Sequence, residues 1–248
     1  MTDGPRGAIH IGCAGWSLPR AAHEQFPQQG SHLQRYAARL PAVEINSSFY
    51  RSHRPATYAR WAASVPDTFR FSVKVPRTIT HEGMLADAET KLDTFLSEAS
   101  ALGGKLGCLL VQLPSSLPFD QAIAARFFAA LRERHAGATV LEPRHSSWAA
   151  PECDALLEIF HIGRVAADPP RIPLGGEPRG WRGVIYYRLH GMPRVYFSAY
   201  SDAYLDTLAA SLAVHRKDST ALWCIFDNTG LGAAPINAAG LLDRLAVR

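Results

Sequence analysis

Charged and polar side chains interrupt several short apolar runs of this 248-residue sequence, usually close to the end of the run. The set contains three carboxylates, two arginines, a lysine and a histidine: Glu44, Glu142, Asp227, Arg144, Arg188, Lys74 and His190. Carboxylates beside an imidazole or an amine can transfer protons, and an arginine can bind phosphate or carboxylate through two parallel hydrogen bonds. These residue types indicate acid–base chemistry on an anionic substrate, provided that the fold brings them together.

The apolar runs themselves predict that fold. Eight of them begin near residues 8, 42, 69, 107, 138, 162, 183 and 221, and helix-like stretches lie between most of them. Repeated strand–helix alternation over about 250 residues favours an α/β protein of the (β/α)8 TIM-barrel type. An open dinucleotide-binding sheet is the competing architecture, but no GxGxxG follows the first run. We expect one barrel domain over residues 1–248.

The segments between the runs carry helix signals with one exception. Ser31 is a candidate N-cap, Pro55 suits a first helical turn, and a helix is expected from Leu85 to the glycines at 103 and 104. The segment 168–182, after the sixth strand, is rich in proline and glycine and disfavours a normal helix. We expect an irregular loop that replaces or shortens that helix.

Alternation along each strand selects the side chains that point into the barrel. Val43 and Ile45 suit the helix-covered face, which turns Glu44 and Asn46 inward, and the same parity turns Lys74 inward. The polar residues then gather at the carboxyl ends of the strands, where barrel enzymes build their sites. We predict catalytic roles for Glu44, Glu142, His190 and Lys74. We predict substrate binding by Trp16, Asn46, Tyr50, Arg77, His81, Gln112, Arg144, Trp148, Arg188, Asp227 and Asn228.

Composition narrows the class of protein. The chain is 47% hydrophobic and 19% charged, which is sufficient for a large core, and its net charge is +4. No stretch approaches the roughly 18 continuous apolar residues of a membrane helix, so no membrane association and a cytoplasmic location are expected. The four cysteines are far apart in the sequence, and we interpret them as small buried apolar residues. No cofactor is required by the sequence and no metal site is predicted.

Several strings resemble one known family. IGCAGWS, VEINSSFYR, FSVKVPRTITH, LLVQLP, LEPRHSSW, YYRLHG and FDNT, in this order between Ile9 and Ala239, are similar to motifs of the YecE-like family, domain-of-unknown-function family 72. The resemblance implies a TIM-type barrel in a bacterial cytoplasm and no established reaction. Members carry an aromatic-rich segment where this sequence reads LPRAAHEQFP, which keeps only Phe26 and Pro27 and implies altered specificity there.

Three functions remain open from the sequence. The first is an enzyme for an anionic or polyhydroxylated small molecule, in which Arg144 and Arg188 anchor the substrate; a glycosidase version would place Glu44 and Glu142 on either side of the scissile bond. The second is a metal-dependent, phosphodiesterase-like hydrolase. The third is a non-catalytic protein that binds an anionic ligand or nucleic acid. Pairs such as Glu44–Lys74 or Glu142–Arg188 also have a purely structural interpretation as ion pairs inside the barrel.

Overall fold

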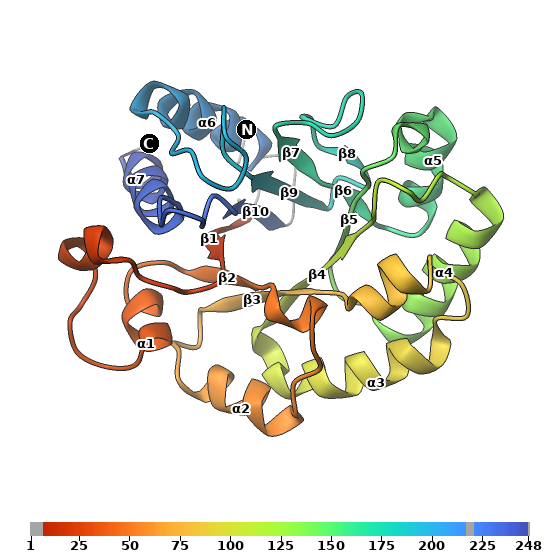
Figure 1. Ribbon diagram of the computed structural model, residues 1–248, viewed down its shortest axis with the longest axis horizontal. Coiled ribbons are helices and arrows are strands. Elements are labelled where there is room, and N and C mark those ends of the chain that lie inside the picture. Colours follow the sequence, from red (N-terminus) through yellow and green to blue (C-terminus); the bar gives the residue numbers. More distant parts are fainter. Residues whose placement is uncertain (1–6, 217–220, 248) are drawn as a thin grey trace, which may run out of the picture.

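A nearly closed ring of strands surrounded by helices forms the centre of the computed structural model, which describes residues 7–216 and 221–247 (Figure 1). The strands are β1 (Ala8–Ala14), β2 (Ala42–Ile45), β3 (Arg70–Lys74), β4 (Leu106–Gln112), β5 (Thr139–Glu142), β6 (Gly163–Arg164), β7 (Ala166–Asp168), β8 (Arg179–Gly180), β9 (Val184–Leu189) and β10 (Ala221–Phe226). Neighbours follow chain order from β1 to β6, and β10 and β9 continue the sheet on the other side of β1. The predicted TIM-type α/β barrel is confirmed.

The sixth strand position closes the ring although it is interrupted. Its first half, β6, pairs with β5, and its second half, β7, pairs with β9. Val165 lies between them, and its N–H donates to the carbonyl oxygen of Leu141 at 2.9 Å. A single short segment, residues 163–168, therefore joins the two edges of the sheet.

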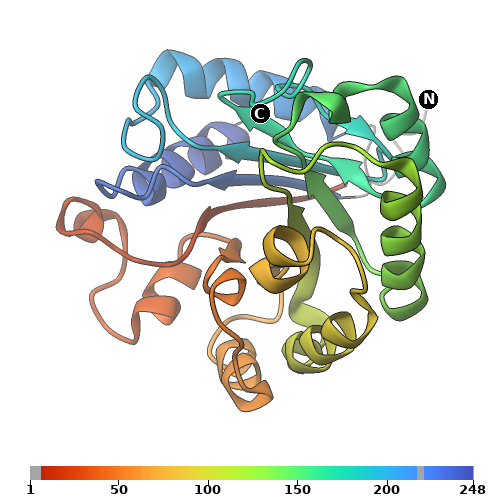
Figure 2. The ribbon, with the colours of Figure 1, turned by 45° about the vertical axis from the view of Figure 1, so that its right-hand side comes forward.

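Helices cover the outside of the sheet in both views (Figure 1, Figure 2). They are α1 (His32–Ala37), α2 (Pro55–Ala63), α3 (Glu89–Ala99), α4 (Gln121–Arg134), α5 (Pro151–Ile159), α6 (Asp202–His215) and α7 (Ala234–Ala246), with short turns η1 (Arg20–Gln25), η2 (Ser47–Phe49), η3 (Thr78–Glu82), η4 (Ser100–Lys105) and η5 (Ser146–Ala149). Ser31 caps α1 in a reciprocal capping box with Gln34, and Pro55 is the first residue of α2, as predicted.

Helix α3 begins four residues later than the apolar spacing predicted. Met84, Leu85 and Asp87 have φ angles of 48°, 67° and 47°, which a right-handed helix does not allow. Leu85 and Ala88 are nevertheless buried, so their spacing reflects core packing of a turn rather than a helical face.

The proline- and glycine-rich segment after β7 contains no helix within its described residues 169–183. It returns along the barrel and forms β8, which pairs antiparallel with β6. Arg179 of β8 donates from Nε to Asp154 of α5 at 2.7 Å. The segment thus replaces the sixth helix, as predicted, and lies against α5.

Two separate apolar clusters flank the sheet. The larger lies between strands and helices and includes Val43 and Ile45, which the alternation assigned to the helix-covered face, together with Phe71 and Val73. The smaller fills the barrel with Ala42, Cys108, Leu110, Val140, Val165, Val184, Tyr186, Trp223 and Ile225. Burial of this apolar area is the main stabilising contribution, at about 25 cal/mol per Å². The interior is therefore an apolar plug of closely packed side chains. The polar residues at the carboxyl ends of the strands lie directly above it.

All four cysteines are buried and free of disulfides, which confirms their interpretation as small hydrophobes. Among residues 7–216 and 221–247, no helix has the length and apolar character needed to span a bilayer.

Candidate functional site

The carboxyl ends of six strands bring the polar residues to one end of the barrel. In the sheet register Glu44 of β2 pairs with Ser72 of β3, and Gln112 of β4 pairs with Glu142 of β5. Glu44 has its predicted inward orientation, because Val43 and Ile45 on either side of it pack in the cluster between strands and helices. Neighbouring strands therefore place their last inward side chains side by side above the apolar plug.

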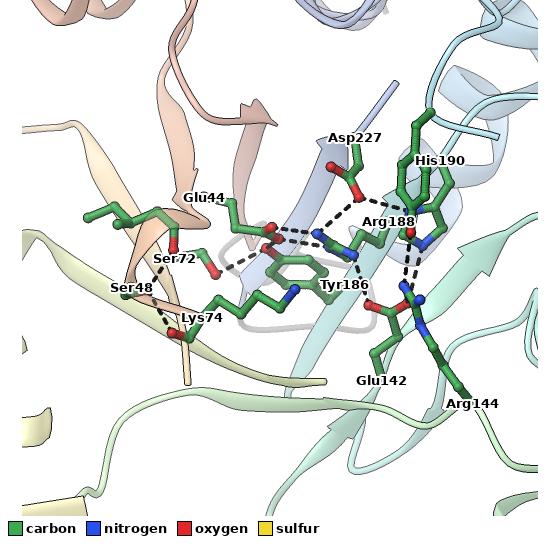
Figure 3. A network of polar contacts seen from close by, with 12 residues as sticks. Glu44, Ser48, Ser72, Lys74, Glu142, Arg144, Tyr186, Arg188, His190 and Asp227 are labelled. Carbon is green, nitrogen blue, oxygen red and sulfur yellow. Dashed lines mark hydrogen bonds and ion pairs between the residues drawn. The ribbon is translucent and has the colours of Figure 1, made fainter. Parts of the chain in front are cut away.

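Arg188 of β9 is the centre of this group (Figure 3). Its Nε and Nη2 donate to the two carboxylate oxygens of Glu44 at 3.0 and 2.7 Å. Nη1 donates to Glu142 at 3.1 Å, and Nη2 lies 3.1 Å from Asp227. Burial opposes the charge of Arg188, but Asp227, Glu44 and Glu142 outweigh it and raise the pKa of the guanidinium well above its usual value. One cation thus neutralises parts of three buried carboxylates.

His190 connects two of the same carboxylates from a fully buried position. Its Nδ1 lies 3.0 Å from Asp227, and its Nε2 lies 3.2 Å from Glu142. Burial lowers the pKa of His190, but Glu142 and the bond to Asp227 outweigh that effect and raise it overall. Burial likewise raises the pKa of Glu142, yet Arg188 and His190 hold it well below the usual range. The arrangement fits an imidazolium that donates from both ring nitrogens.

Tyr186 completes the network and was missed from the sequence. Its hydroxyl donates to Glu44 at 2.9 Å and lies 3.0 Å from the hydroxyl of Ser72. The available signal was parity, since Tyr186 lies two residues before Arg188 on the same face of β9. We call Glu44, Glu142, Tyr186, Arg188, His190 and Asp227 the paired network.

Lys74 lies beside this network but does not join it. Its side chain is 5% exposed, and its Nζ lies 4.0 Å from the centre of the Phe49 ring. With the residues that the structure describes, Nζ makes no hydrogen bond and no ion pair, and no dashed line reaches it in Figure 3. Burial, reinforced by repulsion from Arg188, lowers the pKa of Lys74 to about 8, although the three carboxylates oppose the shift. Lys74 is thus a buried amine without a direct polar partner.

Two further polar groups near Lys74 lack partners. The amide of Gln112 is buried and forms no side-chain hydrogen bond with any residue in the described ranges. The buried Oδ1 of Asn46 is likewise unpaired there. Asn46, Lys74 and Gln112 come from the ends of the adjacent strands β2, β3 and β4, and we call them the unpaired set. Of their side-chain polar atoms, Oδ1 of Asn46 is fully buried without a partner. Buried polar groups are normally hydrogen-bonded, so this atom, on a strand next to that of Lys74, indicates a place for a ligand or for water.

Arg144 lies at the boundary between the two groups. Its Nη2 donates to Glu142 at 3.2 Å and lies 3.4 Å from the hydroxyl of Tyr196, while its Nε is buried without a partner. Tyr196 also packs edge-on against His190, with ring centroids 5.6 Å apart. Tyr196 was not predicted from the sequence; it belongs to the loop after β9 and has a φ of 70°.

The loop after β3 adds positive charge to the rim. His81 contacts Thr80 at 2.9 Å and packs edge-on against Phe49. Burial lowers the pKa of His81, and Lys74, Arg144 and Arg77 lower it further, so the imidazole is surrounded by cations. Arg77 pairs with Glu82 at 2.9 Å in a half-exposed position. Phe49 and Arg77 also line a neighbouring cleft of about 430 Å³.

Four of the predicted binding residues lie apart from this group. Trp148 is 1% exposed and donates from Nε1 to the carbonyl of Leu117, so it belongs to the core. Trp16 packs edge-on against Trp61, and Tyr50 is 68% exposed on the wall of the neighbouring cleft. The Nδ2 of Asn228 donates to Ser198 and to Asn237. The sequence placed these residues on the right loops but could not give the direction of their side chains.

The segment with the unusual composition, residues 18–27, forms η1 and then turns inward at Phe26. Phe26 is buried and stacks on Tyr36, with ring centroids 6.4 Å apart. Leu18 and Pro19 line a cleft of about 570 Å³ between the loops after β1 and β10. The region where the resemblance implies aromatic residues is therefore open at this position.

Metal-ligating side chains do not gather in the part of the chain that the structure describes: no group of three or more His, Cys, Asp or Glu residues there has a geometry suited to a metal ion. The physical reason lies in the paired network. Glu44, Glu142 and Asp227 converge on the guanidinium of Arg188, which occupies the place where a cation would meet their oxygens.

Two curated proteins are similar to this chain in sequence. UPF0759 protein YunF of Bacillus subtilis is 26% identical over 268 residues, covering 96% of this chain and 95% of YunF. UPF0759 protein YecE of Escherichia coli is 32% identical over 109 residues, covering 44% of this chain and 38% of YecE.

Solved structures agree on the fold. A DUF72 family protein from Enterococcus faecalis superposes with a TM-score of 0.80 at 21% identity, covering 97% of this chain and 96% of the other. One from Thermotoga maritima superposes with a TM-score of 0.79 at 23% identity, covering 96% and 99%. The family model described as "Protein of unknown function DUF72" matches residues 10–248. The chain therefore belongs to the DUF72 family.

Proposed function

We propose that the protein is an enzyme that binds a small anionic molecule at the carboxyl end of the barrel, with Lys74 as the group that exchanges protons. The observation that carries the proposal is Lys74, a nearly buried side chain whose ammonium makes no ion pair with a described residue, on the strand between the one that precedes Asn46 and the one that ends at Gln112. A buried charge without a partner is unfavourable by several kcal/mol. An anionic ligand would supply the missing partner and receive hydrogen bonds from the same groups.

Arg144 is the candidate anchor for the anion. Arg188 was the second arginine expected in this role, but its donors already face Glu44, Glu142 and Asp227. Arg144 is partly exposed, and its Nε has no partner. Together with Lys74, it offers an anion two positive groups that belong to different strands. Arg188 is then a positioning residue that holds the carboxylates.

Lys74 is better suited to proton transfer than the carboxylates. A catalytic acid or base works best when its pKa is near the working pH, and the pKa of Lys74 is lowered to about 8. The pKa of Glu142 is held well below its usual range, and its oxygens already accept from Arg188, Arg144 and His190. Glu142 is therefore a poor base at neutral pH and acts as a support for His190.

The other candidate functions receive less support from the geometry. In a glycosidase the scissile bond lies between the two carboxylates, but here the guanidinium of Arg188 bridges Glu44 and Glu142. Several arginines on the outer helices pair with acids, such as Arg134 with Asp93 and Arg39 with Asp243. These pairs interrupt any basic stripe of the kind that a nucleic acid backbone would need.

Thermal unfolding in matched salts tests the binding part of the proposal. Sodium phosphate and sodium oxalate are compared with sodium chloride at equal ionic strength, for wild type, Arg144→Gln and Arg244→Gln. We expect phosphate or oxalate to raise the wild-type and Arg244→Gln midpoints above those in chloride, because a ligand that binds only the folded state stabilises it. Arg144→Gln should lose this gain. Equal midpoints in all three salts for the wild type would overturn the proposal.

Consumption of a metabolite tests the catalytic part. Wild type and Lys74→Met are incubated with a protein-free cell extract, and anionic metabolites are followed by mass spectrometry. We expect at least one anionic compound to be consumed by the wild type alone. Anion-dependent stabilisation without consumption would instead indicate a binding protein.

A further inference from the structure

We propose that Lys74 is a covalent nucleophile that forms an imine with its substrate, so the substrate is an aldehyde or ketone that also carries a carboxylate or phosphate. This inference rests on the proposed function and specifies its chemistry. It starts from the surroundings of a single amine rather than from the charged network beside it.

The position of Lys74 suits nucleophilic attack. Imine formation needs a neutral amine with its lone pair free, and the Nζ of Lys74 donates to no group in the described part of the chain. Phe49 covers one side of Nζ at 4.0 Å from the ring centre, and the side chain as a whole is nearly buried. Lys105 shows the opposite arrangement, since its Nζ donates to the carbonyls of Ala62 and Val65 at 2.8 and 2.7 Å.

Burial also keeps a useful fraction of the amine neutral. The pKa of Lys74 is lowered to about 8, first by burial and then by Arg188. At pH 7.4 such an amine is neutral about two hundred times more often than an ordinary lysine with a pKa of about 10.4. Desolvation beside a second cation is a recognised way of activating lysine for attack on a carbonyl group.

The chemistry balances with the groups present. The neutral Nζ attacks the carbonyl carbon, an N–C bond forms, and the carbonyl oxygen receives the proton that the nitrogen gives up. The C–O bond of this carbinolamine then breaks as its oxygen takes one more proton and leaves as water, giving a protonated imine. Solvent supplies that proton, because both ring nitrogens of His190 are already directed at carboxylates.

Nearby charges favour the product. Glu44, Glu142 and Asp227 each act to raise the pKa of Lys74, which means that they stabilise positive charge at this nitrogen. A protonated imine places a positive charge at the same point. Arg144 would hold the anionic group of the same substrate through its unpaired Nε. Both cations, Lys74 and Arg144, act on His81, so a substrate that carries a carbonyl group and an anionic group, such as a 2-oxo acid, could meet the amine with one and the guanidinium with the other.

The choice of lysine at this position has chemical meaning. The chain holds 26 basic residues, of which four are lysines, at positions 74, 91, 105 and 217. Arginine would hold an anion equally well or better, but only a primary amine forms an imine. A lysine in a site built with arginines is therefore consistent with covalent chemistry.

Reductive trapping tests the inference with three probes: glyoxylate, pyruvate and glycolaldehyde phosphate. Wild type is incubated with each probe and sodium cyanoborohydride at pH 7.4, and the four lysine-containing peptides are quantified by mass spectrometry. We expect saturable labelling of Lys74 by at least one probe, at least tenfold faster than labelling of Lys91. Labelling of Lys74 no faster than that of Lys91 with all three probes would overturn the inference.

Lys74→Arg separates this inference from the proposed function. The variant keeps a cation and should keep phosphate- or oxalate-dependent stabilisation while losing the trapped adduct. If the wild type is stabilised by these anions but not trapped, the anion site stands and the covalent role is wrong. If it is neither stabilised nor trapped, both are wrong.

Discussion

The two sides of the barrel mouth differ in how their polar groups are satisfied. In the paired network, on β2, β5, β9 and β10, Arg188 and His190 meet carboxylates through nearly all of their donors. In the unpaired set, on β2, β3 and β4, Lys74 and Gln112 have no such partners. Similar residue types at the carboxyl ends of the strands of one barrel thus differ in their coordination. The difference is one of coordination: the charged groups of the paired network hold one another in place, whereas Lys74 and Gln112 keep donors and acceptors that no described side chain uses.

The paired network and Lys74 also contribute to the pH dependence of stability in different pH ranges. The pKa values of Glu142 and Asp227 are lowered, so their contribution to stability is present above ordinary carboxyl pKa values and is lost as the pH falls through the folded-state values. The pKa of His190 is raised, so its contribution is present below about pH 6.5 and is lost as the pH rises through its folded-state value. Lys74 behaves differently, because its burial is unfavourable below about pH 8 and this disadvantage is relieved above it.

Arg188→Met should disrupt the paired network and produce the largest loss of stability. It leaves Glu44, Glu142 and Asp227 buried without their shared cation, and removal of one partner from a buried ion pair typically costs about 3–5 kcal/mol. Urea unfolding measures the loss, or the soluble yield does if the variant fails to fold.

Arg244→Gln is the matched control for that change, because Arg244 also contacts two carboxylates but on the surface. Its urea midpoint should stay close to the wild-type value. An Arg188→Met variant as stable as Arg244→Gln would contradict the proposed difference between the two sides.

Lys74→Met should change the stability in the opposite direction and make the protein more stable. It removes a buried charge without an ion pair, so the free energy of unfolding at pH 7 should increase by about 1–3 kcal/mol. Between about pH 8 and pH 10.5 the free energy of unfolding of the wild type should rise relative to that of the variant. The reason is that the folded protein loses the Lys74 proton at a lower pH than the unfolded chain does. Urea unfolding at pH 7 and at pH 10 checks both statements.

Lys105→Met provides the comparison, since Lys105 has hydrogen-bond partners and should lose stability when replaced. Destabilisation by Lys74→Met as large as that by Lys105→Met would show that the ammonium of Lys74 has a stabilising partner in the folded protein.

Tyr186→Phe should weaken the paired network by a smaller amount. The variant removes the hydroxyl that donates to Glu44 and contacts Ser72, which should reduce stability by about 1–2 kcal/mol. Tyr58→Phe is the control, because Tyr58 is also buried but its hydroxyl forms no hydrogen bond with a described residue. Equal losses in the two variants would show that the network does not depend on Tyr186.

Gln112→Leu should have the smallest effect on stability. Because the amide of Gln112 has no partner, the unfolding free energy should change by less than about 0.5 kcal/mol, while stabilisation by phosphate or oxalate weakens. Gln34→Leu, which removes the acceptor of the Ser31 N–H in the capping box, should reduce stability and leave the anion effect unchanged. A loss of stability in Gln112→Leu with an unchanged effect of phosphate or oxalate would show that Gln112 does not contact the anion.

The sequence was sufficient for the barrel and for the residues that converge in it. Strand alternation assigned Glu44, Lys74 and Arg188 to the interior because parity is a local property of each strand. The partners of these residues depend on register between strands and on shear around the ring, which no single segment determines. For that reason Arg188 was expected at the substrate but lies among carboxylates, and Tyr186 was missed.

Loop residues were the least predictable from sequence. Trp148 and Tyr50 both follow strand ends, yet one is buried in the core and the other is exposed. The unpaired state of Lys74 was equally inaccessible, since the sequence suggested Glu44 as its partner and the structure gives Glu44 to Arg188. Only the competition between cations for the same carboxylates decides which of them remains free.

Titration of the lysine side chains by NMR tests the central claim most directly. With only four lysines, carbon-13 labelling at Cε and comparison with Lys74→Arg assign the Lys74 signal. We predict an inflection near pH 8 for Lys74, which moves to higher pH when phosphate or oxalate binds beside the ammonium. A Lys74 signal that titrates near pH 10.5 with the other lysines, and does not respond to either anion, would contradict the account.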